Sequence, residues 1–255
     1  MFIDTHCHLN DSKYENVDLV INNFIKDEVD VAINMGCNSQ SSEFGRELAE
    51  KYEQIYFATG YHPSDVEDFT DQEFDKIVKL TSHQKCLAIG EIGLDYHWLP
   101  FDKKAQTDCF IKQLELAKTS KLPVCIHSRD CTEDMLKILK ENRSKLEFGA
   151  VMHCFSGSVE TARELLNLGL YISFAGPLTF KNAGKLLSVA EYVPTEYCLT
   201  ETDSPYLAPH PLRGTINEPK NVSLVCSFLA KIKGEQVDEF ATKIMQNAKR
   251  LFTKL

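Results

Sequence analysis

The sequence lacks several features that would assign it to familiar classes of protein. No apolar run approaches the ~18 to 20 residues that a membrane-spanning helix needs, and the chain enters an apolar, strand-like run at Met1, so we expect no signal peptide. The nine cysteines are odd in number and scattered, without the paired spacing of a zinc ribbon. These absences favour a cytoplasmic protein with reduced cysteines, most of them in the core.

An excess of positive charge is also missing. The formal net charge is −9, which argues against a long basic track that coats nucleic acid through many phosphate contacts. It does not exclude a nuclease, because divalent cations and a few arginines can offset the charge locally at an active site. The net charge therefore limits how a nucleic acid would bind, not whether it binds.

Low-complexity stretches, charge blocks and flexible linkers are absent, and 255 residues with 43% hydrophobic content suffice for a full core. We therefore expect a single domain over residues 1–255. Eight short apolar runs rich in β-branched residues lie at 1–6, 29–35, 55–60, 86–92, 123–127, 149–154, 170–175 and 197–201. Segments of helical periodicity lie between them, for example 102–120 and 158–168, and the tail at about 217–253 has the pattern of two further helices. Strand and helix alternating eight times predict an α/β fold, a closed (β/α)₈ barrel of the TIM type.

Six side chains with metal-binding chemistry end or follow these predicted strands. They are His6, His8, Glu91, His127, His153 and Asp203. The carboxyl ends of the strands of such a barrel meet at one mouth, where barrels of this type carry their chemistry. His6 and His8 also share one face of their strand, because side chains alternate between faces. The pattern predicts a metal centre at the C-terminal mouth.

The number and type of these ligands indicate how the centre works. Six side chains exceed the three or so that one catalytic ion takes from the protein, and a bridging carboxylate lets them serve two ions. We expect Glu91 to be the bridge and Asp203 to be the general base for the shared water. The remaining ligands would divide into His6, His8 and Asp203 at one ion and His127 and His153 at the other. Imidazole with carboxylate suits Zn²⁺ or Mn²⁺, and carboxylate with water suits Mg²⁺, so ligand type alone leaves the metal open.

Further polar residues near the predicted mouth each have two interpretations. Asp4 and Glu201 share strand faces with the ligands and would orient imidazoles or backbone groups, or else serve only as buried, hydrogen-bonded residues. Arg129 and Arg213 follow two of the strands and would clamp a phosphate, although a surface arginine is often only solvated. His62 follows the third predicted strand and is a candidate substrate contact.

The loop after the fourth predicted strand contains Tyr96, His97 and Trp98. His97 and Trp98 can stack on or hydrogen-bond to a base or sugar, or they can simply pack within the loop. Tyr96 is a further candidate substrate contact.

The residues above occur in ordered blocks that resemble the TatD family of metal-dependent deoxyribonucleases, which belongs to the amidohydrolase-like barrels. The resemblance covers nearly the whole chain. It rests on FIDTHCHL at 2–9, AIGEIGLDY at 88–96, IHSR at 126–129, HCFSG at 153–157 and ETDSPYL at 201–207, followed by RG at 213–214 and NEP at 217–219. Several such blocks in the right order are highly specific.

The resemblance implies the same six metal ligands, assistance by Mg²⁺ or Mn²⁺, and hydrolysis of DNA phosphodiesters, often from a 3′ end, with roles in DNA repair or DNA degradation. We expect a monomer acting on single-stranded or end-accessible DNA. Many related barrels bridge their ions with a carbamylated lysine on the fourth strand, whereas this chain has Glu91 and no lysine between Lys85 and Lys103. That difference favours the TatD-like branch.

Two other functions stay open. One is an amide, lactone or small phosphate-ester hydrolase that uses the same metals, because a barrel does not dictate its substrate. The other is a non-catalytic, metal-dependent binding module, against which the complete ligand set argues.

Overall fold

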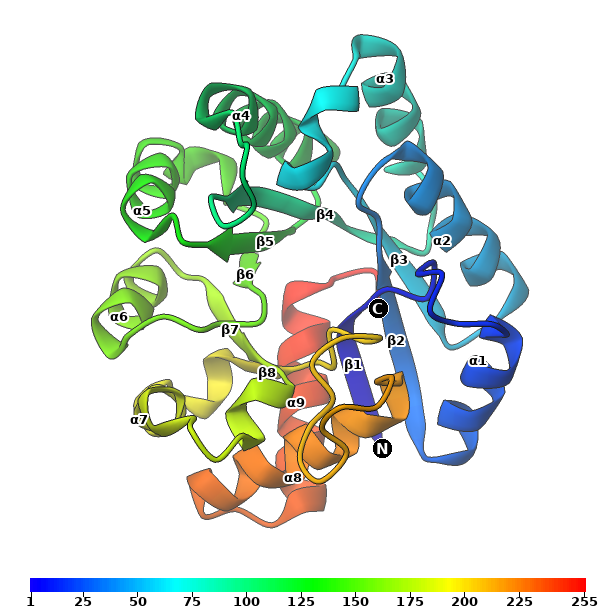
Figure 1. The fold of residues 1–255 in the computed structure, drawn as a ribbon, viewed down its shortest axis with the longest axis vertical. Coiled ribbons are helices and arrows are strands. Elements are labelled where there is room, and N and C mark those ends of the chain that lie inside the picture. The colour runs from blue at the N-terminus through cyan, green and yellow to red at the C-terminus, as the bar shows by residue number, and fades with distance from the viewer.

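Eight parallel strands form the inner wall of the molecule, and this computed structural model, which describes residues 1–255, confirms the (β/α)₈ barrel (Figure 1). The strands pair in chain order. They are β1 (Phe2–Cys7), β2 (Val29–Met35), β3 (Ile55–Thr59), β4 (Cys86–Asp95), β5 (Val124–Arg129), β6 (Ala150–Met152), β7 (Tyr171–Phe174) and β8 (Cys198–Thr200). Their bounds agree with the predicted runs to within two residues except for β4, which continues to Asp95.

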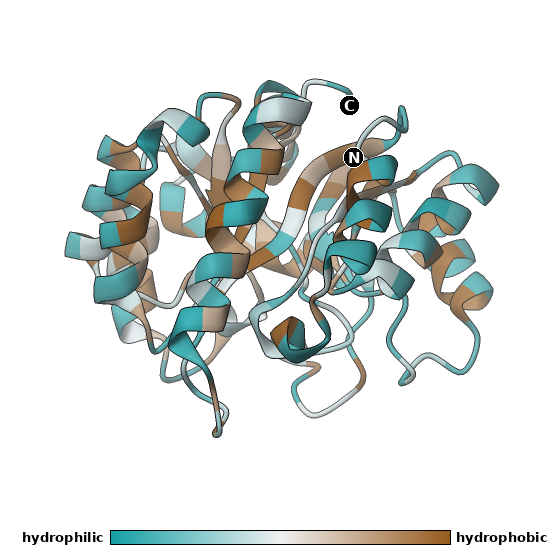
Figure 2. Ribbon diagram, turned by 90° about the horizontal axis from the view of Figure 1, so that it is seen from above, coloured by the Kyte–Doolittle hydropathy of each residue, from teal (hydrophilic) through white to brown (hydrophobic).

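Helices follow the strands and form the outer ring. They are α1 (Val17–Lys26), α2 (Ser39–Lys51), α3 (Asp71–Leu80), α4 (Lys103–Ser120), α5 (Thr132–Glu141), α6 (Val159–Asn167), α7 (Gly184–Tyr192), α8 (Val222–Lys233) and α9 (Val237–Leu251). Asn16, Asn38, Thr70, Asp102 and Ser158 start five of them by accepting backbone N–H groups of the first turn. Hydrophobic and hydrophilic residues alternate around the helices, as expected for helices that cover a barrel (Figure 2).

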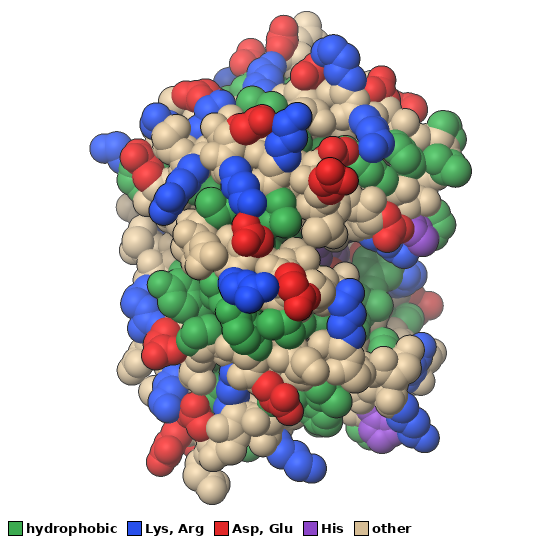
Figure 3. All heavy atoms as spheres, turned by 90° about the vertical axis from the view of Figure 1, so that its left-hand side faces the viewer, with side chains coloured by type: hydrophobic (Ala, Val, Ile, Leu, Met, Phe, Trp, Pro, Cys, Tyr) green, Lys and Arg blue, Asp and Glu red, His purple; other side chains and the backbone are tan.

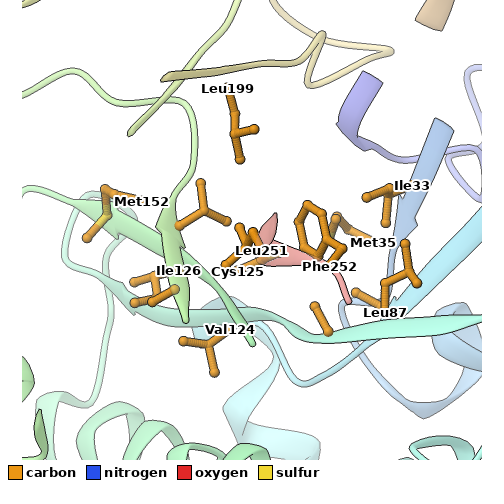
Figure 4. Close-up of a cluster of buried hydrophobic side chains, with 14 of the residues drawn as sticks. Ile33, Met35, Leu87, Val124, Cys125, Ile126, Met152, Leu199, Leu251 and Phe252 are labelled. Atoms are coloured by element: carbon orange, nitrogen blue, oxygen red, sulfur yellow. The ribbon is translucent and has the colours of Figure 1, made fainter. Parts of the chain in front are cut away.

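The end of α9 fills the barrel at the amino ends of the strands. Leu251 and Phe252 lie among strand side chains such as Ile33 and Cys125 (Figure 4), and Phe252 is fully buried. Lys254 then donates to the carbonyl of His83, just before β4, at 3.2 Å. The two predicted tail helices are therefore present as α8 and α9, and the chain end closes the barrel in addition to completing the outer ring.

At the other end of the barrel, the C-terminal mouth, contacts between β1 and the segment after β8 complete the ring of strands. The Asp203 N–H donates to the His6 carbonyl at 2.9 Å, and the His8 N–H donates to the Ser204 carbonyl at 2.7 Å. Asp203 has a φ of +55°, in the left-handed region that residues other than glycine rarely adopt. This closure fixes Asp203 beside His6 of β1 and His8, which follows that strand.

Acidic and basic side chains are intermixed on the side of the molecule that carries α5 and α6, without a continuous basic track (Figure 3). None of the nine helices combines the length and the apolar character needed to cross a bilayer.

Candidate metal centre

The six expected ligands lie together at the C-terminal mouth. Three of them belong to strands, His6 to β1, Glu91 to β4 and His127 to β5. His8 and His153 directly follow β1 and β6, and Asp203 lies three residues after the end of β8. All of them except His6 line a pocket of about 510 Å³, where the Glu91 side chain is only 3% exposed. Four overlapping groups of donor atoms at this place have spacings suitable for holding a metal ion.

One set of donors consists of the Nε2 atoms of His6 and His8, Oε2 of Glu91 and Oδ1 of Asp203. The two imidazole nitrogens are 3.2 Å apart. His6 Nε2 is 3.3 Å from the Glu91 oxygen and 3.7 Å from the Asp203 oxygen, and His8 Nε2 is 3.4 Å from each. Ligand atoms about 2.0 to 2.1 Å from a tetrahedral Zn²⁺ lie roughly 3.3 Å from one another. These four atoms therefore have the spacing of a coordination shell.

The other oxygen of Glu91 faces a second set of donors. Its Oε1 lies 2.8 Å from His127 Nδ1 and 2.8 Å from His153 Nε2, and these two nitrogens are 3.3 Å apart. His62 Nε2 is 3.6 Å from the same oxygen. Each oxygen of Glu91 therefore faces a different set of donors.

Strand register brings the second set together. Gly93 of β4 pairs with His127 of β5, and Ile126 pairs with Met152, directly before His153. Gly93 has a φ of +149°, and a Cβ at this position would lie 2.0 Å from the His127 carbonyl oxygen. Only glycine therefore permits the close approach of β4 and β5 that sets His127 beside Glu91.

Asp95 contacts one of the candidate ligands, and the sequence pattern did not identify it beforehand. Its Oδ2 lies 2.9 Å from His127 Nε2, so that Nε2–H donates to the carboxylate and Nδ1 is left facing Glu91. Gln106 fixes the Asp95 backbone through hydrogen bonds of 2.9 and 2.8 Å. The available signal was the two-residue strand period, which places residues 91 and 95 on one face once β4 is known to extend that far.

The two expected supporting carboxyl groups have different surroundings. Asp4 accepts the backbone N–H groups of His6 at 3.2 Å and Thr202 at 2.9 Å, and it also accepts the Thr202 hydroxyl. Burial raises the pKa of Asp4 to about 8. Glu201 accepts the backbone N–H of Cys154 and lies 3.3 Å from His153 Nδ1. Glu201 thus faces a ligand ring, whereas Asp4 ties β1 to the segment after β8.

Burial and neighbouring imidazoles act in opposite directions on the carboxylates of the centre. Burial acts to raise the pKa of Glu91, but the nearby His153 and His6 outweigh it and hold that pKa well below its usual value. For Asp203, burial likewise acts to raise the pKa, and the hydrogen bond with His8 and the neighbouring imidazoles lower it overall. Both carboxylates are therefore ionised at neutral pH and available to cations.

Among the candidate substrate contacts, Arg129, His62 and Trp98 line the pocket, and His97 does not. Arg129 also lies over the ring of Trp98, with its guanidinium carbon 5.3 Å from the ring centre. His62 accepts the Ser64 N–H through Nδ1 at 3.1 Å, which turns its Nε2 toward Glu91. His62 thus lies beside the candidate metal ligands as well as in the wall of the pocket.

The other two expected substrate contacts, Tyr96 and Arg213, do not line this pocket. The Tyr96 hydroxyl donates to Asp134 at 3.0 Å, which directs the side chain toward α5. The Arg213 guanidinium carbon lies 4.2 Å from the centre of the Phe180 ring. Both side chains are held by partners outside the pocket.

A (β/α)₈ barrel with clustered imidazole and carboxylate donors at its C-terminal mouth has the architecture of the metal-dependent hydrolases. The family model described as TatD related DNase matches residues 3–253. The chain belongs to this family.

Similar proteins extend over the same length. A protein of Bacillus subtilis (strain 168) named uncharacterized metal-dependent hydrolase YabD is 43% identical over 253 residues, which cover 99% of each chain. The uncharacterized metal-dependent hydrolase YcfH of Escherichia coli (strain K12) is 38% identical over 254 residues, covering 98% of this chain and 95% of the relative. The crystal structure of YJJV, a TatD homolog from Escherichia coli K12, superposes with a TM-score of 0.93 at 30% identity, covering 99% of this chain and 98% of the other. The protein is a metal-dependent hydrolase of the TatD family.

Proposed function

We propose that this protein is a deoxyribonuclease that hydrolyses DNA phosphodiesters with the help of two divalent metal ions, removing nucleotides from a 3′ end. The observation that carries the proposal is the position of Glu91, whose two oxygens face two separate sets of donors. Membership of a family described as TatD related DNase supports DNA as the substrate. The single-strand preference, a role in DNA repair, the monomeric state and the cytoplasmic location stay predictions.

The donor set fits two divalent ions. His6, His8, Glu91 and Asp203 would hold one, and Glu91, His127 and His153 would hold the other. With neutral imidazoles, the form that binds metal, the pocket lining contains five carboxylates and one arginine, an excess of four negative charges, and two divalent cations would match it. Mg²⁺ or Mn²⁺ is the proposed ion in function, with Zn²⁺ also compatible with imidazole ligands. Such ions, when bound, would acidify a water molecule and offset charge on the phosphate and the leaving oxygen.

The residues of the chain divide the remaining work. Oδ1 of Asp203 lies beside the imidazoles, and the other oxygen would accept the proton of the attacking water. Arg129 lies at the edge of the same pocket, where its guanidinium can hold a phosphate oxygen. Asp95 binds Nε2 of His127, and Glu201 lies beside Nδ1 of His153. Each carboxylate thereby keeps the other nitrogen of its histidine directed at the centre.

A labelled single-stranded DNA incubated with metal-stripped protein tests the proposal directly. Mg²⁺, Mn²⁺ or Zn²⁺ is added back, and Glu91→Ala and Asp203→Asn are compared with Asp108→Asn, a control at an exposed carboxylate of α4. We expect metal-dependent shortening by the parent and the control only. Removal from the 3′ end should give a ladder from a 5′ label and should release a 3′ label in mononucleotides. If Glu91→Ala cut at the parental rate, the bridging role would be wrong.

The same preparations distinguish the other hydrolase activities. A panel of lactones, cyclic amides and small phosphate esters is assayed beside the DNA, and kcat/KM is compared. Intact DNA with every metal, together with rapid turnover of a lactone or small ester, would replace the nuclease by a small-molecule hydrolase.

A further inference from the structure

Exposed apolar side chains gather on two loops beside the metal pocket. Ten large apolar side chains of the chain are exposed, and half of them belong to the loops after β4 and β8. These are Trp98, Leu99, Tyr206, Leu207 and Ile216. Apolar surface that is left exposed around a pocket marks a binding site more often than a folding requirement.

The two loops face each other across the mouth. The strands β4 and β8 are four positions apart in a closed ring of eight, so the loops that follow them lie on opposite sides (Figure 1). Trp98 from one loop and Tyr206 from the other line the same pocket as Glu91. Trp98 is 63% exposed and Tyr206 is 41% exposed. A ligand that reaches the metal centre therefore passes between two aromatic side chains.

Each of these aromatic side chains has a cation beside it. The Arg129 guanidinium lies over the Trp98 ring at 5.3 Å, and the Lys13 ammonium lies over the Tyr206 ring at 3.8 Å. The Tyr206 hydroxyl is held by Asp11, which fixes the orientation of the ring. We define Trp98 with Arg129 and Tyr206 with Lys13 as the two aromatic–cation pairs of the mouth. Arg129 and Lys13 are the only cations that lie over aromatic rings of the pocket lining.

A ring with an adjacent cation matches the two parts of a nucleotide, its flat base and its phosphate. Stacking on an aromatic side chain is available only to an unpaired base, because the faces of a paired base are covered by its neighbours in the duplex. A double helix, whose major groove alone is about 12 Å wide, does not fit into a pocket of about 510 Å³ with the ligands at its floor. A single strand with its bases turned outward does.

We propose that Trp98 and Tyr206 are stacking sites for two unpaired bases that flank the phosphodiester at the metal centre, with Arg129 and Lys13 contacting the neighbouring phosphates. This inference rests on the proposed nuclease function and adds to it the residues that bind the bases. It separates the recognition of bases, at the rim, from the chemistry on the phosphate, at the floor.

Trp98 is the only tryptophan of the chain, so its fluorescence reports on the site directly. The metal-loaded protein is titrated with a short thymidine oligonucleotide whose linkages are phosphorothioates that resist cleavage. A matched strand carries abasic units in place of the bases and keeps the same backbone charge. We expect the base-containing strand to quench Trp98 fluorescence and the abasic strand to leave it nearly unchanged.

Cleavage assays on Trp98→Ala and Tyr206→Ala test the same sites in catalysis. Stacking contributes enough per base that each variant should lose about 10-fold in kcat/KM on single-stranded DNA. On an oligonucleotide with abasic units beside the cleaved bond, the same variants should match the parent. Trp98→Phe and Tyr206→Phe keep a ring and should retain most of the activity. Tyr192→Ala is the matched control, because Tyr192 is equally exposed at 42% and lies at the end of α7 that leads to the amino end of β8.

Each other outcome overturns either the stacking sites or the nuclease function on which they rest, and the two failures are distinguishable. An equal loss on the base-containing and abasic strands would mean that the aromatic residues support the metal centre and do not bind bases. Parental activity in both alanine variants would remove the stacking sites and leave the nuclease function standing. Fluorescence quenching by DNA that the parent never cleaves would remove the nuclease function and leave the base-binding sites standing.

Discussion

Replacing Asp95 by Ala should weaken one of the two proposed metal sites and spare the other. The carboxylate accepts the Nε2–H of His127 at 2.9 Å and touches no ligand of the set formed by His6, His8 and Asp203. Without it, the His127 ring is free to rotate and to present either nitrogen to the centre. We expect the change to lower the metal affinity more than the free energy of unfolding.

The size of the effect follows from the type of bond lost. A hydrogen bond to a charged group contributes about 1.5 to 3 kcal/mol, which corresponds to roughly 10- to 150-fold in an equilibrium constant. Loss of a group that orients a metal-binding histidine costs about 10- to 100-fold in metal affinity or activity. Asp95→Ala should therefore weaken binding of the second ion about 10- to 100-fold. Asp95→Asn, which keeps an oxygen acceptor, should lie between this variant and the parent.

Calorimetric titration of Mn²⁺ into the metal-stripped protein measures both binding steps. Asp130→Ala is the control, because Asp130 is a 63% exposed carboxylate of the neighbouring loop that binds His97 and no ligand. It removes the same charge from nearly the same place. Unchanged titrations for Asp95→Ala, or an equal loss in Asp130→Ala, would refute the orienting role. A loss of the same size in both binding steps would refute the assignment of Asp95 to one site.

Three further predictions concern stability. Phe252→Ala removes a fully buried ring from the end of the barrel and should lower the free energy of unfolding by about 3 to 5 kcal/mol in denaturant titrations, with metal affinity nearly unchanged; weaker metal binding by the folded variant would link the two ends of the barrel. Gly93→Ala places a Cβ 2.0 Å from the His127 carbonyl oxygen and should destabilise the fold by about 2 kcal/mol or more and weaken the second metal site; a stable variant with parental metal affinity would contradict the role assigned to this glycine. Removal of the ions by a chelator should lower the melting temperature, because a ligand at 100 times its Kd contributes about 2.7 kcal/mol per site; Glu91→Ala should melt at the same temperature with and without added metal.

Most of the fold was predictable because strand and helix periodicities differ and recur eight times. The run at 29–35 coincides with β2, and the others agree within two residues except at β4. There, Gly93 has the signature of a strand end, although its φ of +149° is compatible with continued pairing to His127. Periodicity also predicted α9, but it did not predict where the end of this helix packs. The burial of Leu251 and Phe252 inside the barrel depends on the geometry of the whole ring, which no local pattern contains.

The clustering of the six candidate ligands was predictable because the fold itself brings strand ends together, whereas the positions of loop side chains were not. Glu91 and His127 lie on strands, so the topology fixes their positions. Arg213 and Tyr96 lie at or beyond strand ends, where the chain can turn a long side chain toward several partners, and they contact Phe180 and Asp134. The orientation of the His127 ring by Asp95 depends on rotamers, which spacing in the sequence does not determine.

The acidic character of the pocket gives the metal ions a second role. A polyanionic substrate approaches a chain of net charge −9 at a pocket that has five carboxylates and one arginine, Arg129. When its imidazoles are neutral, as metal binding requires, the pocket without ions repels phosphate. In the proposed nuclease, two divalent ions would balance the excess negative charge and leave Arg129 to attract the backbone. In the proposed nuclease, metal loading and DNA binding are coupled, because each divalent ion that neutralises Glu91 and its neighbours would also remove the repulsion that excludes the substrate. A basic surface track is unnecessary in such an enzyme, since the ions supply the attraction at the bond to be cleaved.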